Sequence, residues 1–201
     1  MSRPAPQFLF DFGSPNAFLS HEAIPAIEKR TGVKFEYVPV LLGGIFKATN
    51  NKSPAESLAG IKNKPEFQMV ETERFVRRFA VKPYTPNPFF PVNTLNLMRA
   101  AVAAQFEGVF EKYVDAAFHY MWVEPKKMDD PEVALKALAG SGLDAAKLFA
   151  RAGRRRQGEA DREHAGGRRA RRVRFADLFR RQGNVFGKEQ LREVEELVSG
   201  K

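Results

Sequence analysis

The sequence contains no cysteine among its 201 residues. Disulfide bonds, thiolate ligands for a metal and a cysteine nucleophile of the protein's own are therefore excluded. Histidine is also scarce, because the chain has only His21, His119 and His164. No two of these are spaced to lie on one helix face as metal ligands, so the sequence predicts no metal site.

Long hydrophobic runs are missing as well. No apolar run reaches the roughly 18 residues that a membrane-spanning helix needs, and the N-terminus lacks the basic and then apolar layout of a secretion signal. The hydrophobic content of 43% is typical of a soluble globular protein. We therefore expect a cytoplasmic protein with one core, or with one domain that carries a large insertion.

Positive charge is plentiful but is concentrated in one place. The chain has 33 Lys and Arg against 24 Asp and Glu, a net charge of +9, and residues 154–182 supply +7 of it through 11 arginines and four acidic residues. A charge of this size suggests nucleic acid or an acidic surface as a partner. Because the rest of the chain is nearly neutral, such binding would have to reside in residues 154–182.

The stretch 7–19, QFLFDFGSPNAFL, changes from a strand pattern to a helix pattern within a few residues. Residues 8–12 are short, aromatic and bounded by proline and glycine, which predicts a buried strand of a parallel sheet. Ser14 suits a helix N-cap and Pro15 the first helical position. Apolar residues then recur at helical spacing, so we expect a helix over residues 15–29.

A helix that begins after Ser14 offers a site for an anion. The unpaired N–H groups and the positive end of the helix stabilise negative charge, and the Ser14 hydroxyl can donate a hydrogen bond to the same anion. A thiolate or a carboxylate would fit. The alternative is that Ser14 only caps its helix, which is the more frequent role of an isolated Ser-Pro pair.

The remainder of the chain predicts a second strand followed by helices. Residues 33–40 alternate as a strand, and residues 45–53 are expected to form a loop at its carboxyl end, where open α/β sheets usually hold ligands. Helical periodicity then extends over residues 54–152, except for a proline-rich aromatic loop at 81–91. Residues 186–198 predict an amphipathic helix, which is either a second anion site or a plain surface helix.

Four motifs occur together in this chain: DFGSPNAFL at 11–19, LLGGIFK at 41–47, NNKSP at 50–54 and FGKEQL at 186–191. In this order they resemble the 2-hydroxychromene-2-carboxylate isomerases, which belong with the kappa-class glutathione transferases in the DsbA-like thioredoxin superfamily. The resemblance implies an α/β, thioredoxin-like fold with an inserted all-helical domain. It divides the chain into a discontinuous thioredoxin-like domain, 1–45 with 170–201, and a helical insertion at 46–169, and it implies a homodimer.

The resemblance implies glutathione as the cofactor, with its sulfur beside Ser14. Related disulfide oxidoreductases carry Cys-x-x-Cys at this helix start, so a chain without cysteine cannot perform dithiol exchange. The helix dipole and the Ser14 hydroxyl would lower the pKa of the glutathione thiol. By motif position, the resemblance implies further contacts to the tripeptide from Asn51, from Lys62 or Lys64, and, at the γ-glutamyl end, from Lys188 and Glu189.

The resemblance also implies an aromatic substrate, walled by Tyr84, Phe89, Phe90, Asn93, Asn96 and Arg99. Ordinary alternatives are a core position for Phe89 and Phe90 and a solvated charge or structural pair for Arg99. The implied reaction is a cis-trans isomerisation of 2-hydroxychromene-2-carboxylate to a trans-o-hydroxybenzylidenepyruvate type product, by addition and elimination of the thiolate.

Residues 154–182 depart from the family pattern, which has a cis-proline turn and a strand before the last helix. Without them, the glutathione site would be incomplete in the chain as written. Back-translating residues 172–181 with permitted codons and starting one base later reads Ala-Phe-Gly-Ser-Pro-Thr-Phe-Phe-Val, which restores the turn. We therefore expect a frameshift in a GC-rich coding sequence to be the origin of this arginine-rich stretch.

Two further functions stay open beside the isomerase. The first is a kappa-like glutathione transferase, which would consume glutathione where an isomerase would not. The second is a basic nucleic-acid-binding module that acts through residues 154–181, whose binding would weaken with salt and require that segment.

Overall fold

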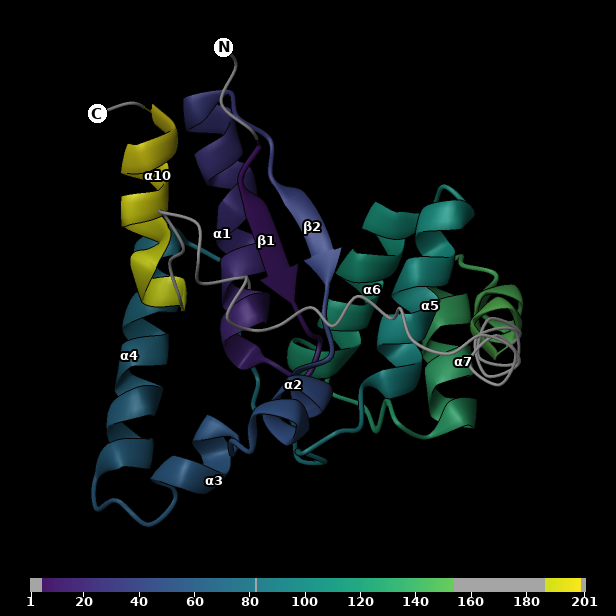
Figure 1. Ribbon diagram of the computed structural model, residues 1–201, viewed down its shortest axis with the longest axis horizontal. Helices are drawn as coiled ribbons and strands as arrows, with labels where there is room; N and C mark the ends of the chain where they lie inside the picture. Colours follow the sequence, from purple (N-terminus) through teal and green to yellow (C-terminus); the bar gives the residue numbers. More distant parts are fainter. Residues whose placement is uncertain (1–4, 82, 154–186, 200–201) are drawn as a thin grey trace. The chain divides into compact units, whose positions relative to one another are not determined.

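The computed structural model describes residues 5–81, 83–153 and 187–199 (Figure 1). The arginine-rich stretch 154–182 and its predicted frameshift lie outside the described residues. By spatial contacts the chain forms two compact units, Met1–Tyr84 with Gly183–Lys201, and Thr85–Gln182. The predicted domains follow family topology instead, so their boundary at residue 45 stays a prediction. None of the described helices has the length and apolar character that crossing a membrane requires.

The first unit is built on two parallel strands that a helix connects. Strand β1 (Gln7–Phe10) pairs in parallel with β2 (Glu36–Pro39), and helix α1 (Pro15–Thr31) connects them (Figure 1). Phe8 lies opposite Tyr37 in the register, and their rings meet edge to face with centroids 5.0 Å apart. The predicted strands are therefore confirmed, with shorter bounds.

Helix α1 follows its sequence signals at both ends. The Ser14 Oγ accepts a hydrogen bond from the Ala17 N–H at 3.2 Å, and Pro15 occupies the first turn. Gly32 ends the helix with φ 71°, a left-handed conformation that strains any residue with a Cβ. The apolar face of the helix is fully buried and includes Phe18, Leu19, Ile24 and Ile27.

The predicted loop over residues 45–53 is wrong for its first half, because helix α2 (Leu42–Thr49) occupies it. The glycine pair Gly43-Gly44 lies in the first turn of this helix, where glycine is an unfavourable residue. The Leu42 N–H at the helix start donates a hydrogen bond to the Asp11 carboxylate at 2.8 Å. An acceptor from 31 residues earlier thus supports a helix start that local propensity disfavours.

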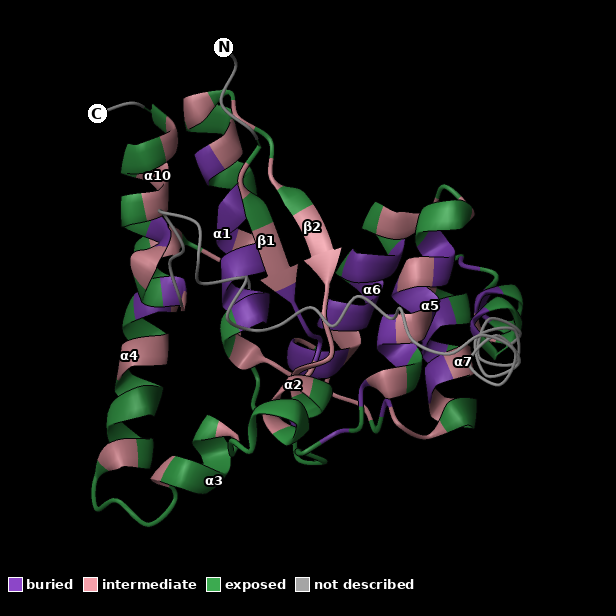
Figure 2. Ribbon diagram, in the orientation of Figure 1, coloured by how far each residue is buried: buried purple, intermediate pink, exposed green. Residues whose placement is uncertain are grey.

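The first unit is completed by α3 (Pro54–Leu58), α4 (Lys64–Phe79), the 3₁₀ turn η1 (Lys188–Gln190) and α10 (Leu191–Ser199). Helix α1 packs against α4, η1 and α10. Within this unit, Figure 2 shows most of the buried residues on α1, whereas α4 and α10 are largely exposed. The predicted C-terminal amphipathic helix is confirmed over its described residues.

In the second unit, over its described residues 85–153, every element of regular secondary structure is a helix. The unit contains α5 (Leu95–Phe106), α6 (Phe110–Trp122), α7 (Pro131–Gly140) and a further helical stretch at 145–153. The preceding proline-rich segment has no regular secondary structure, as its prolines predict. A helical insert is therefore present, and its predicted bounds, 46–169, stay a prediction.

Helices α5 and α6 form the core of this second unit. Small alanines on α5, including Ala100 and Ala104, are fully buried beside the large side chains of α6, such as Phe118. Tyr113 on α6 is also fully buried, and its hydroxyl donates a hydrogen bond to the Leu97 carbonyl at 2.9 Å. Burial raises the pKa of the Tyr113 hydroxyl well above its ordinary range.

Replacement of Tyr113 by phenylalanine tests this packing. We expect Tyr113→Phe to lower the free energy of unfolding by about 1 kcal/mol, because a buried hydrogen bond is lost without a change of shape. Urea denaturation followed by circular dichroism measures the change. The control is Tyr120→Phe, whose half-buried hydroxyl is 3.4 Å from the Ser141 Oγ and so contributes little. Equal effects of the two substitutions would contradict the assignment.

Candidate functional site

Ser14 lies in the turn between β1 and α1 and is half-buried. Its N–H donates to the Asp11 carbonyl at 3.0 Å, and its Oγ accepts from the Ala17 N–H. A hydroxyl that caps a helix uses an oxygen lone pair, so its hydrogen can still be donated to a ligand. The predicted N-cap role is confirmed, while the anion site at Ser14 stays a prediction.

Asp11 ties this turn to the start of α2, a role that the sequence analysis missed. Its carboxylate is only 2% exposed and accepts hydrogen bonds from the Gly13 and Leu42 N–H groups, both at 2.8 Å. A buried carboxylate requires such donors, because burial of an uncompensated charge is costly. The available signal was an acidic residue set between two buried aromatics, Phe10 and Phe12.

The predicted tripeptide contacts Asn51, Lys62 and Lys64 lie on the segment that follows α2. Asn51 is exposed, and its Oδ1 accepts from the Lys52 N–H at 2.9 Å. Lys62 is exposed in the turn before α4, whereas Lys64 is half-buried with its Nζ 5.4 Å from the Phe67 ring centre. Among the described residues, no hydrogen bond or ion pair joins these three to Ser14.

Lys188 and Glu189, the predicted γ-glutamyl contacts, form an ion pair at the start of η1. The Lys188 Nζ lies 2.5 Å from the Glu189 Oε1 and 5.8 Å from the centre of the Phe75 ring on α4. The Lys188 side chain is 7% exposed, whereas the Glu189 side chain is 55% exposed. Burial raises the pKa of Glu189, but the hydrogen bond from Lys188, a backbone N–H and the Lys188 charge together hold that pKa below its ordinary value. Glu189 is therefore ionised at neutral pH.

Gly187 leaves the space that the Glu189 carboxylate occupies. The backbone of Gly187 has φ 94°, and a Cβ built there would lie 2.5 Å from the Glu189 Oε2. Any other residue would be strained by its backbone and would also displace the carboxylate. The glycine that the sequence places before this helix thus serves the position of one side chain.

Of the predicted substrate residues, Tyr84 belongs to the first unit. Its ring centroid is 6.5 Å from that of Phe18 on α1. Burial raises the pKa of the Tyr84 hydroxyl, so the group is a neutral hydrogen-bond donor at neutral pH. An aromatic ring with one polar end is a suitable wall for an aromatic ligand.

The other predicted substrate residues belong to the second unit. Phe89 is 47% exposed and Phe90 41%, so the core alternative for these two residues is wrong. Asn93 precedes α5, where its Oδ1 accepts from the Leu95 N–H at 3.1 Å. Asn96 is exposed on α5, and Arg99, three residues further along the same helix, is half-buried. Their role toward a substrate stays a prediction.

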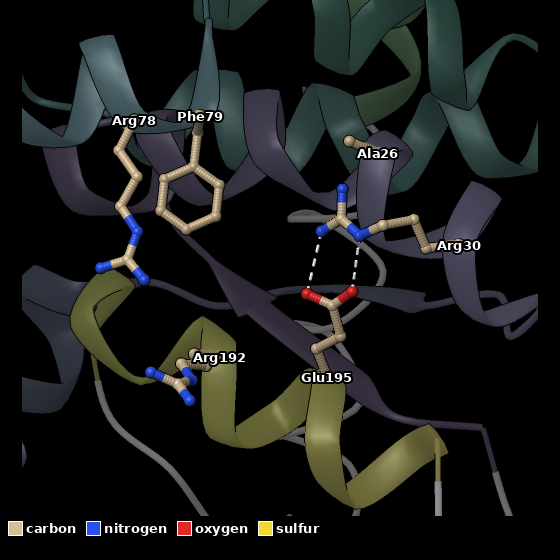
Figure 3. A pocket seen from close by; sticks show the side chains of 6 residues that line it. All are labelled: Ala26, Arg30, Arg78, Phe79, Arg192 and Glu195. Carbon is tan, nitrogen blue, oxygen red and sulfur yellow. Dashed lines mark hydrogen bonds and ion pairs between the residues drawn. The ribbon is translucent and has the colours of Figure 1, made fainter.

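A depression of about 250 Å³ in the first unit is lined by none of the predicted ligands (Figure 3). Arg30 of α1 binds Glu195 of α10 through two hydrogen bonds, at 2.6 and 2.9 Å, and these bonds raise the pKa of Arg30. Figure 3 shows Arg78, Phe79 and Arg192 around the same space. The Arg30–Glu195 pair joins α1 to α10, and none of the six residues that line this depression is a buried polar one.

The second unit has a depression of about 170 Å³ beside a further ion-pair cluster. Glu107 pairs there with Lys147 at 2.6 Å and with Arg151 at 2.9 Å. The hydrogen bond from Lys147, followed by the charges of both cations, lowers the pKa of Glu107. Across the described residues, no group of three His, Asp or Glu side chains is arranged to hold a metal ion.

The parallel βαβ unit, the serine-capped start of α1 and the helical second unit define a thioredoxin-like protein. A model of the DSBA-like thioredoxin domain matches residues 7–174, and the chain belongs to this family. The motif-based resemblance and the predicted fold class are both confirmed.

Two characterised relatives give the relationship more detail. One is 2-hydroxychromene-2-carboxylate isomerase of Sphingobium xenophagum, 30% identical over 145 residues that cover 70% of each chain. Another is glutathione S-transferase kappa 1 of Rattus norvegicus, 26% identical over 153 residues that cover 72% of this chain and 66% of the rat enzyme. A solved structure of SeMet 2-hydroxychromene-2-carboxylate isomerase matches with a TM-score of 0.70 and 18% identity, covering 96% of this chain and 94% of that chain, which shows the same fold.

Replacement of Asp11 by asparagine tests the link between the Ser14 turn and α2. The amide can accept from one of the two N–H groups but presents its own N–H to the other, so a buried donor is left unpaired. We expect Asp11→Asn to lower the free energy of unfolding by about 2 kcal/mol. Urea denaturation measures this, with Glu36→Gln as the control, since that carboxylate is exposed and accepts from the Gln7 side chain across the strand pair. A loss no larger than that of the control would contradict the role of Asp11.

Proposed function

We propose that the protein is a glutathione-dependent cis-trans isomerase that acts on 2-hydroxychromene-2-carboxylate-like aromatic compounds. The observation that carries this proposal is the serine-capped start of α1 in a chain without cysteine. The 30% identical relative from Sphingobium xenophagum supports the reaction class. A helix start with a hydroxyl donor and no protein thiol suits a thiolate that belongs to a bound molecule.

The residues present suit glutathione group by group. Ser14 would donate its hydroxyl hydrogen to the sulfur, and the α1 dipole would stabilise the thiolate. The half-exposed, ionised Glu189 carboxylate suits the γ-glutamyl ammonium, while Asn51 and the cation of Lys62 or Lys64 suit the remaining amide and carboxylate groups. When bound, glutathione would supply the nucleophilic sulfur that this chain lacks.

The aromatic and polar side chains predicted for the substrate suit its chemical groups one by one. Tyr84 and Phe89 would provide flat apolar surface, and Asn93 and Asn96 would provide amide donors. Arg99, a half-buried guanidinium, suits the substrate carboxylate because it can bind both carboxylate oxygens at once. By the same family resemblance, we propose that the enzyme works in the cytoplasm as a homodimer.

A kappa-like glutathione transferase is the second candidate, and the 26% identical rat relative favours it. The two functions share the thiolate site and differ in the fate of the sulfur. A transferase retains the sulfur in its product, whereas an isomerase releases it. Product analysis by mass spectrometry therefore separates them, since conjugation consumes glutathione in proportion to product and isomerisation leaves it unchanged.

Substitution of Ser14 by alanine tests the thiolate site, and the chain offers a matched control. Ser53 also precedes a proline and caps a helix, with its Oγ accepting from the Glu56 N–H at 3.3 Å. Each alanine variant loses a cap worth about 1 kcal/mol. We expect only Ser14→Ala to raise the pKa of the bound glutathione thiol toward its free value and to slow isomerisation, by about tenfold or more. Thiolate ultraviolet absorbance against pH and the isomerisation rate are the two measurements.

Two results would contradict the proposal. If Ser14→Ala and Ser53→Ala have the same thiol pKa and the same rate, Ser14 is a cap and no more. If the unchanged protein binds no glutathione in calorimetric titration, the proposed cofactor is wrong for this chain.

A further inference from the structure

Lys188 is unusual because its ammonium group is turned into the protein. Lysine is seldom buried, and its long side chain normally extends to place the charge in water. Here the side chain is 7% exposed, and its Nζ lies between the Glu189 carboxylate and the Phe75 ring. A cation in this position faces two groups of the protein that both stabilise it, an anion and an aromatic face.

The Glu189 carboxylate is fixed on several sides at once. Its Oε1 is held by Lys188, and its Oε2 lies over Gly187, where a Cβ would be 2.5 Å away. A carboxylate has about four lone-pair directions, so these contacts leave room for a further donor. More than half of the side chain is exposed, which gives a ligand access to it.

We propose that Lys188 is a positioning residue whose buried ammonium group holds Glu189 as the receptor for an ammonium group of the ligand. The inference rests on the proposed function, and for glutathione the group received is the α-ammonium of the γ-glutamyl residue. Lys188 itself does not touch the ligand. It acts on the ligand through the place and the charge of Glu189.

The charges around Glu189 set the direction of its pH response. The Phe75 ring on α4 faces Lys188, and on the neighbouring helices Arg30 of α1 pairs with Glu195 of α10, and Arg192 with Glu196 within α10. Lys188 is thus the charged side chain that opposes the effect of burial on Glu189 in the described structure. Without it, the pKa of Glu189 rises, and its charge is lost at a higher pH as the solution is acidified.

The experiment compares two ligands by calorimetric titration of the full chain. One is glutathione, and the other is its analogue without the α-amino group, which keeps the adjacent carboxylate. Their affinity ratio reports the contact of Glu189 with the ammonium group. We expect the unchanged protein to prefer glutathione by about tenfold. Glu189→Gln should abolish the preference at every pH tested.

Lys188→Met is the decisive variant, because it keeps an apolar chain against Phe75 and removes the charge. We expect it to reduce the preference at neutral pH and to abolish it at a pH where the unchanged protein still shows it. Lys188→Arg, which retains the charge, should restore part of the preference. The control is Lys34→Met, which breaks a Lys-Glu contact of the same 2.5 Å length on an 84% exposed lysine and should leave the ratio unchanged. If Lys188→Met does not fold, Lys188→Gln takes its place.

Two results would overturn the positioning role. Equal weakening of both ligands by Lys188→Met would show that Lys188 binds the shared carboxylate directly. Unchanged affinities for both ligands at every pH would show that Lys188 only stabilises the fold. Failure of the unchanged protein to bind glutathione is a different result, because it removes the proposed function and with it the role of Glu189.

Discussion

The buried carboxylate of Asp11 is the interaction on which the first unit depends. It accepts one N–H from the turn that presents Ser14 and one from the first residue of α2, each at 2.8 Å. Two segments 31 residues apart in sequence are thereby fixed to the end of one strand. Burial of the apolar face of α1 supplies the hydrophobic stabilisation. This stabilisation is non-directional, so it does not determine the conformation of a turn. Hydrogen bonds to a buried charge are directional, and they define where Ser14 and α2 begin.

The absence of cysteine changes what a thioredoxin-like helix start can do. In a disulfide oxidoreductase this position supplies the reacting sulfur, and the helix dipole stabilises its thiolate. In this chain the same position supplies a hydroxyl, with an N-cap bond to the Ala17 N–H and a hydrogen left to donate. The fold therefore keeps the electrostatic environment, and under the proposed function the nucleophile would come from a bound molecule. A serine at this place is consistent both with capping and with thiolate binding, because one oxygen and one hydrogen serve the two roles separately.

Residues close together in the sequence correctly predicted the elements whose ends they define. Ser14, Pro15 and Gly32 mark the ends of α1, and the aromatic run before Gly13 marks β1, so the sequence alone located the candidate thiolate site. Helix α2 was not predicted because the group that stabilises its start, the Asp11 carboxylate, lies in a distant part of the sequence. The burial of Lys188 was beyond prediction for the same reason, since Phe75 of α4 lies more than a hundred residues earlier in the chain. Family motifs named Lys188 and Glu189 together as predicted ligands, but only the packing of η1 against its neighbours shows that the first side chain is buried and the second half-exposed.

Asp11 and Glu189 show how burial gives two similar carboxylates different capacities for further hydrogen bonds. Both lie next to a glycine turn that leads into a helical element, and both are held by defined donors. The Asp11 carboxylate is buried and accepts hydrogen bonds from two backbone N–H groups of the protein, so its role is to stabilise the fold. The Glu189 carboxylate is held by one buried ammonium group and remains half-exposed, so part of its hydrogen-bonding capacity faces outward. A carboxylate that must receive a ligand needs this intermediate state, because full exposure would leave it mobile and full burial would close it to the ligand.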